Sequence, residues 1–177
     1  MVSRTLRISV VAVSSPLWAL LNAYVGPLGF QLFNLPILCD LSSYLPLLVA
    51  AGLARIPGTA ISVSFVGSLI LLLLRPGAFH IFGFVASSIL FEALAFTVRY
   101  RLTGRFLNVV VACVATIASA YLAGVSIGIV FMGRGLEWSL GYWGPLHASG
   151  GVLSLVVGLP TLKALEKALR IEGGEKV

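Results

Sequence analysis

Six runs of mostly apolar residues, each about the length of a membrane span, constrain this chain more than any other feature. A helix needs about 20 such residues to cross the hydrocarbon core of a bilayer, with a range of about 17 to 25. The runs lie near residues 8–25, 38–54, 59–74, 79–98, 106–131 and 145–162. They predict an all-α membrane protein of about six transmembrane helices in one bundle, and a single integral membrane domain over residues 1–177.

The composition supports the same class of protein. Hydrophobic residues make up 59% of the 177 positions and charged residues 10%, whereas soluble domains are roughly half apolar and a quarter charged. The net charge of +6 is divided among short clusters between the apolar runs. Membrane anchoring and orientation explain such clusters, so we expect no nucleic-acid partner.

The distribution of Lys and Arg predicts the orientation, because cytoplasmic loops retain the excess of basic residues. With six spans and both termini in the cytoplasm, only Arg75 and Arg134 fall outside. The inner side then holds Arg4, Arg7, Arg55, Arg99, Arg101, Arg105, Lys163, Lys167, Arg170 and Lys176. We therefore expect a multi-pass protein of the cell (plasma) membrane.

The two ends of the chain allow further interpretations. Residues 163–177 read as a short cytoplasmic amphipathic tail with Glu166 and Arg170 four positions apart. A cleaved signal peptide over residues 1–23 is a rival to the first span, because arginines, an apolar stretch and a small-x-small end occur there. The charge distribution fits six spans without this cleavage.

Two stripes of small residues predict close helix contacts, since helices in lipid associate where small side chains let their backbones approach. On the first run the stripe is Ser15, Ala19 and Ala23. On the fifth run it is Ala112, Thr116, Ala120, Gly124 and Gly128. Internal packing is the expected role of the second stripe, and the first is a candidate for docking a partner protein.

Motifs of several enzyme classes are missing from the sequence. The chain has no GxxxxGK[ST] phosphate loop, no HExxH and no GxSxG. Its two histidines, His80 and His147, have no neighbouring set of metal ligands. We therefore expect neither enzymatic activity, nor a metal, nor a cofactor.

Polar and aromatic residues gather at the predicted outer ends of the spans. The segment Glu137–His147 combines three aromatic rings, a carboxylate and an imidazole with glycines that permit a fold-back, and we interpret it as a binding loop. The apolar loop 26–36 is a candidate lid. The residues expected to bind a ligand at this side are Asn34, Tyr44, Glu137, Trp138, Tyr142, Trp143 and His147.

Glu92 is a carboxylate well inside the fourth run, roughly 20 Å below the outer end of its helix. Ionisable groups at such a depth usually face a bundle interior, a cavity or a partner. The sequence leaves two roles open, a structural hydrogen-bonding group and a group that binds or couples to a ligand.

Three stretches resemble a known family. PLWALLNAYVGPL (16–28), ARIPGTA (54–60) and SSILFEALAFTVRYR (87–101), together with six spans, are similar to the substrate-binding S-components of energy-coupling-factor (ECF) vitamin transporters, and most resemble the branch for thiamine and hydroxymethylpyrimidine. The resemblance implies a membrane subunit that binds a vitamin from outside and delivers it through an ECF transmembrane coupling subunit and an ATPase pair. It implies that Ala19 and Ala23 dock the coupling subunit, and that Glu92 and 138–143 hold an aminopyrimidine.

Other functions compete with a vitamin importer. A self-sufficient transporter or channel normally shows more charges within the membrane or paired broken helices. A small membrane enzyme of lipid or isoprenoid metabolism would use Glu92 or Asp40 with a histidine as acid and base. A ligand-free membrane scaffold is the remaining alternative.

Overall fold

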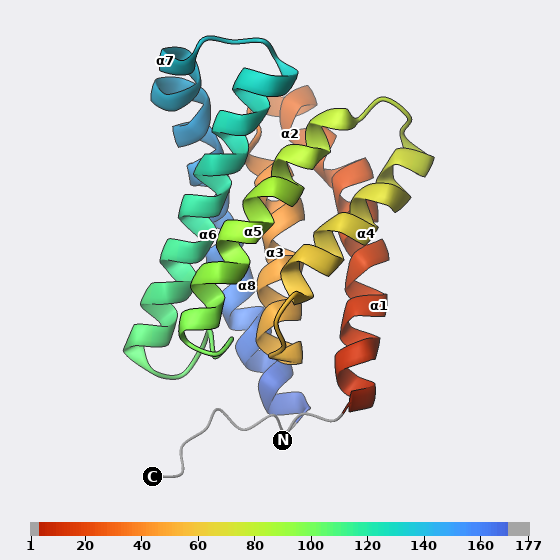
Figure 1. The fold of residues 1–177 in the computed structure, drawn as a ribbon, viewed down its shortest axis with the longest axis vertical. Helices are drawn as coiled ribbons and strands as arrows, with labels where there is room; N and C mark the ends of the chain where they lie inside the picture. Colours follow the sequence, from red (N-terminus) through yellow and green to blue (C-terminus); the bar gives the residue numbers. More distant parts are fainter. Residues whose placement is uncertain (1–3, 170–177) are drawn as a thin grey trace.

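The apolar runs form helices, because a backbone in hydrocarbon must satisfy its N–H and C=O groups within its own segment. A computed structural model describes residues 4–169, and no strand occurs among them. The long helices (Figure 1) are α1 (Arg4–Leu20), α3 (Ile37–Ala54), α4 (Thr59–Leu74), α5 (Phe82–Thr97), α6 (Phe106–Ser126) and α8 (Gly144–Ala168). Shorter helical segments extend them: η1 (Leu21–Val25), α2 (Gly26–Phe33), η2 (Phe79–Ile81), η3 (Ile127–Phe131), α7 (Leu136–Trp138) and η4 (Ser139–Trp143).

The helix lengths are those of a multi-pass membrane protein. Five continuous helical segments of the described chain are long and apolar enough to cross a membrane: Thr5–Phe33, Ile37–Ala54, Phe79–Thr97, Phe106–Phe131 and Leu136–Ala168. The sixth, α4, is a shorter apolar helix of 16 residues, or about 24 Å. These segments overlap all six predicted runs, so the prediction of a helical protein with about six spans is confirmed at this level.

The turns between helices alternate between two ends of the molecule (Figure 1). We call the end with α2, α7 and the turn at Arg75 the α7 end. The opposite end holds the start of α1, the turn at Arg55, residues 99–105 and the end of α8, and we call it the arginine end. The arginine end carries most of the basic side chains and corresponds to the predicted cytoplasmic side.

The small-residue stripe on α6 packs against α8, as predicted. Ala112, Thr116 and Ala120 are fully buried. A Cβ atom added at Gly124 would lie 2.7 Å from the His147 ring, closer than side chains tolerate. The glycine therefore lets α8 approach α6 at this level, which brings His147 to its place.

The stripe on α1 also has partners within the chain. Ser15, Ala19 and Ala23 are buried, and Figure 1 shows α1 beside α4. A Cβ atom at Gly67 of α4 would lie 3.0 Å from the Ser15 carbonyl oxygen. The predicted docking of a coupling subunit on this face would therefore require the helices that bury it to move away from α1.

Both segments predicted as loops are helical, and these predictions were wrong. Residues 26–33 form α2, which continues directly from η1. Pro27 lies just after this π-helical turn, where the hydrogen-bonding pattern of the helix changes. Asn34 ends α2 in the left-handed conformation, with φ 55°. Residues 137–147 are likewise helical through α7, η4 and the first turn of α8.

The predicted tail at 163–177 begins as part of α8, which continues to Ala168. Glu166 is buried, and its Oε1 atom lies 2.7 Å from Nη2 of Arg55. It also accepts a hydrogen bond from the Thr103 hydroxyl. Residues 170–177, including the predicted partner Arg170, lie outside the described residues.

Candidate ligand-binding site

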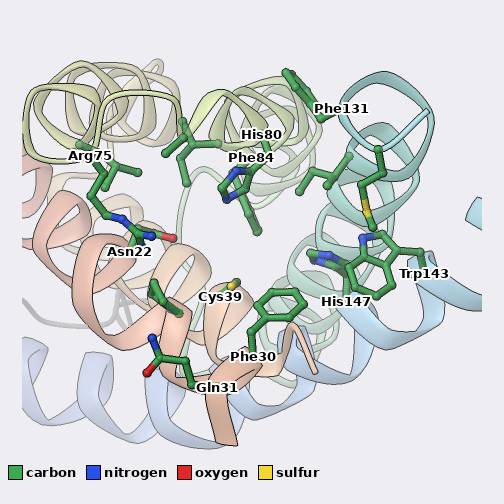
Figure 2. A pocket seen from close by; sticks show the side chains of 16 residues that line it. Asn22, Phe30, Gln31, Cys39, Arg75, His80, Phe84, Phe131, Trp143 and His147 are labelled. Atoms are coloured by element: carbon green, nitrogen blue, oxygen red, sulfur yellow. The ribbon is translucent and has the colours of Figure 1, made fainter. Parts of the chain in front are cut away.

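A cavity of about 480 Å³ lies at the α7 end, within the range of roughly 300–1,000 Å³ typical of small-molecule sites. Side chains from α2, α3, α4, α5 and α8, from the four η segments and from the turns line it (Figure 2). They are Asn22, Pro27, Phe30, Gln31, Cys39, Leu71, Arg75, Ala78, His80, Ile81, Phe84, Ile127, Phe131, Met132, Trp143 and His147.

Three π-helical turns shape this end of the molecule. In η1, η3 and η4 the backbone N–H that follows the turn donates to the carbonyl five residues earlier. Such a turn holds one residue more than an α-helical turn and is frequent at functional sites. Each contributes to the cavity wall, with Asn22 from η1, Phe131 from η3 and Trp143 from η4.

Aromatic rings form one side of the cavity. Trp143 lies 6.0 Å from Phe30 and 5.5 Å from His147 between ring centroids, and Phe84 lies 5.8 Å from His147. Behind this wall, Trp138 stacks on Trp143 at 5.4 Å with an interplanar angle of 20°. The stack fixes the Trp143 ring, so the wall offers planar faces to a flat ligand.

His147 connects the cavity to a buried carboxylate. Its Nδ1 atom lies 3.0 Å from Oδ1 of Asp40, which is fully buried on α3. We assign the proton to Nδ1, because an ionised carboxylate can only accept. The Nε2 atom of His147 is buried, and neither it nor Nε1 of Trp143 has a hydrogen-bond partner among the described residues.

Arg75 stands opposite His147 and Trp143 across the cavity (Figure 2). It follows the last residue of α4, and its Nη1 atom donates to the Ala23 carbonyl over 3.2 Å. Among the cavity-lining side chains of residues 4–169, Arg75 carries the only full charge and none is a carboxylate. The cavity therefore combines a cation, two imidazoles and aromatic faces.

Of the predicted ligand-binding residues, two line the cavity: Trp143 and His147. Trp138 supports Trp143 from behind, and Tyr142 is 51% exposed beside them. Tyr44 is buried, where its hydroxyl lies 2.6 Å from that of Ser87. The remaining two at this end, Asn34 and Glu137, are exposed and do not line the cavity.

Glu92 lies toward the arginine end, away from the cavity. Its carboxylate accepts hydrogen bonds from the backbone N–H groups of Gly58 and Ala60, each over 2.8 Å, and from the Tyr100 hydroxyl over 2.5 Å. Gly58 and Ala60 flank the start of α4, where N–H groups lack intrahelical partners and negative charge is favoured. Of the two roles left open by the sequence, this geometry supports the structural one.

The bond with Glu92 also holds Tyr100, which is buried and has a positive φ of 59°. Burial first, and then the hydrogen bond and charge of Glu92, raise the pKa of the Tyr100 phenol above its usual value. The phenol therefore stays a neutral donor at physiological pH and fastens the segment after α5 to the start of α4.

A second cavity, of about 560 Å³, lies at the arginine end. Arg55, Arg99, Arg101 and Arg105 contribute to its lining. Excess positive charge at one end is the common pattern of cytoplasmic loops in membrane proteins. It accords with the predicted orientation and points to no particular ligand.

Most of the cavity-lining residues were missed at the sequence level. Arg75 was visible as a rare basic residue of the outer side, but nothing in its own run linked it to Trp143. Cys39, next to Asp40, lies in an apolar run that gives no sign of a site, yet it lines the cavity and its thiol donates to the Gly26 carbonyl over 3.4 Å. These residues meet only through the packing of different helices.

Within residues 4–169, no three His, Cys, Asp or Glu side chains group closely enough to hold a metal ion.

The chain was compared with protein-family models, with curated proteins and with solved structures, and it matches none of them.

Proposed function

We propose that this protein is the substrate-binding membrane subunit of an importer of a vitamin-like small molecule, energised by separate coupling and ATPase subunits. The observation that carries the proposal is the aromatic-walled cavity of about 480 Å³ at the α7 end. The Lys and Arg distribution supports an outward-facing α7 end, from which a ligand would enter. The motifs that resemble S-components supply the class of partner, and the missing phosphate loop accords with energy from another subunit.

The test is a binding screen on the purified full-length chain in detergent. The panel contains thiamine, hydroxymethylpyrimidine, riboflavin, biotin, folate, nicotinate and an isoprenoid diphosphate. A compound at a hundred times its dissociation constant should stabilise the folded state by about 2.7 kcal/mol. Trp143→Ala should abolish this shift, whereas Tyr142→Ala, beside it but outside the cavity, should keep it. If no compound of the panel stabilises protein that is shown to be folded, the proposal loses its support.

Binding alone does not establish import, so a second measurement follows. Uptake of the labelled compound is compared in cells that produce this chain alone and in cells that also produce an ECF coupling subunit and ATPase pair. Uptake that requires the added subunits supports the importer. Equal uptake by the chain alone would indicate a self-sufficient transporter.

A membrane enzyme is the second candidate, because His147 lines the cavity and is paired with the buried Asp40 behind it. A carboxylate that orients an imidazole is a common arrangement for general base catalysis. An enzyme would convert a lipid or isoprenoid compound of the panel into a product detectable by mass spectrometry. An importer subunit would bind its compound and leave it unchanged.

A further inference from the structure

The cavity has the charge pattern of an anion site. We propose that its ligand is a flat ring compound bearing a carboxylate, held with its ring against Trp143 and its carboxylate toward Arg75. This inference rests on the proposed function, because it takes the cavity as the ligand site. It differs from the thiamine expectation, since thiamine is a cation.

The charges of the wall carry the first step. Among the described residues that line the cavity, Arg75 has the full positive charge, His80 and His147 are imidazoles, and no carboxylate is present. Asp40 is fully buried behind His147 and does not line the cavity. A cationic ligand would lose its hydration and gain no opposite charge in the wall, whereas an anion would gain one.

Hydrogen-bonding capacity carries the second step. A guanidinium has five N–H donors in a fork that matches a carboxylate, and the bond from Nη1 of Arg75 to Ala23 places the fork at the wall. The carboxylate is therefore assigned to Arg75. Nε1 of Trp143 also lacks a partner among the described residues, but this atom is buried and presents no donor to the cavity.

The shape of the wall carries the third step. The faces of Phe30 and Trp143 are tilted by 33° with centroids 6.0 Å apart, and the Trp138 stack keeps Trp143 in place. A planar ring can lie against such a face with little loss of conformational entropy, while a flexible acyl chain would lose more. The preferred anion is therefore a ring acid and not a fatty acid.

The experiment compares ligands that share a ring and differ in charge. The probes are nicotinate, nicotinamide and 1-methylnicotinamide, which are anionic, neutral and cationic, and the larger pair 1-naphthoate and 1-naphthamide. Binding to the full-length protein is followed by thermal shift and tryptophan fluorescence. We expect the acid of at least one set to bind about tenfold more tightly than its amide, as one charge-assisted hydrogen bond can provide.

Arg75→Gln and Arg134→Gln are matched variants. Both arginines lie at the α7 end and are exposed, but Arg134 lies over the Trp138 ring and does not line the cavity. Arg75→Gln should remove the preference for the acid and leave amide binding unchanged, while Arg134→Gln should keep the preference. An equal effect of the two variants would mean that only the general positive charge of this end matters, and would overturn the proposal.

The remaining outcomes separate this inference from the proposed function. Binding of an amide or a cation as tightly as the acid overturns the anion assignment and leaves the importer standing. If none of these probes binds, the charge of the compound that binds in the broader panel tests the assignment. An acid supports it, and a neutral or cationic compound overturns it. If no compound of either set binds to folded protein, both proposals fail.

Discussion

The Nδ1 atom of His147 lies 3.0 Å from Oδ1 of Asp40, although 107 positions separate the two residues in the chain. The contact joins α8 to α3 within the apolar interior, where a hydrogen bond between polar groups has no competition from water. It also sets the orientation of the imidazole at the cavity wall. One interaction thus serves both helix packing and the shape of the candidate site.

Asp40→Leu should destabilise the protein, because it leaves the buried Nδ1–H group of His147 without an acceptor. An unsatisfied buried donor typically costs about 1–3 kcal/mol. The double variant Asp40→Leu/His147→Leu should recover part of this loss. Thermal unfolding in detergent measures both, with the exposed Glu137→Gln as control. A single variant as stable as the control would show that the pair contributes little.

Glu92→Gln should lower stability without changing ligand affinity. A glutamine offers one acceptor oxygen, so one of the N–H groups of Gly58 and Ala60 loses its partner, and the start of α4 loses a negative charge. We expect a loss of about 1–3 kcal/mol in unfolding free energy. Tyr100→Phe should cost less, because it removes a single hydroxyl. If Glu92→Gln instead abolished binding while stability stayed unchanged, Glu92 would be a ligand group after all.

Gly124→Ala should weaken ligand binding through His147. The added Cβ would lie 2.7–2.8 Å from atoms of the His147 side chain, so the imidazole or α8 must shift. Overpacking of this kind costs roughly 1–3 kcal/mol. Gly141→Ala is the matched control at the same end, because nothing lies within 4 Å of its added Cβ. Dissociation constants of any bound acid should rise only for the first variant.

Glu166→Ala should destabilise the arginine end. It removes the carboxylate that pairs with Arg55 and accepts from Thr103, and both Arg55 and Glu166 are largely shielded from water. We expect a loss of about 1–3 kcal/mol and increased amide hydrogen exchange near the end of α8. Lys167→Ala, on the exposed side of the same helix, should change neither. Equal exchange in the two variants would show that α8 holds its end without this pair.

The spans could be predicted from the sequence because a membrane helix depends on local properties, the length of an apolar run and the breaks around it. The prediction failed where glycine and proline, which often end a helix, lie within a continuous helix. Gly26 and Pro27 suggest a loop, yet the π-helical turn η1 joins α1 to α2 without an interruption, and Pro27 follows this turn inside the continuous helix. The same error affects the aromatic segment 137–147, whose glycines suggest a loop although the segment is helical.

The cavity was predicted only in part. Trp143 and His147 stood out as polar or aromatic residues close together in the sequence. Arg75 and Phe30 line the cavity because distant helices pack together, and no local sequence pattern predicts that packing. For Glu92, a carboxylate deep in a predicted span suggested a ligand. The structure instead pairs it with N–H groups at the start of another helix.

The π-helical turns have a consequence for how proteins of this kind diversify. Each holds one residue more than an α-helical turn, so deletion of a single residue can restore ordinary helical hydrogen bonding. The deletion would change which side chain faces the cavity, while the helix toward the arginine end keeps its register. Changes of length at 21–25, 127–131 or 139–143 are therefore a route by which related chains could exchange one ligand for another and keep the same membrane-embedded core.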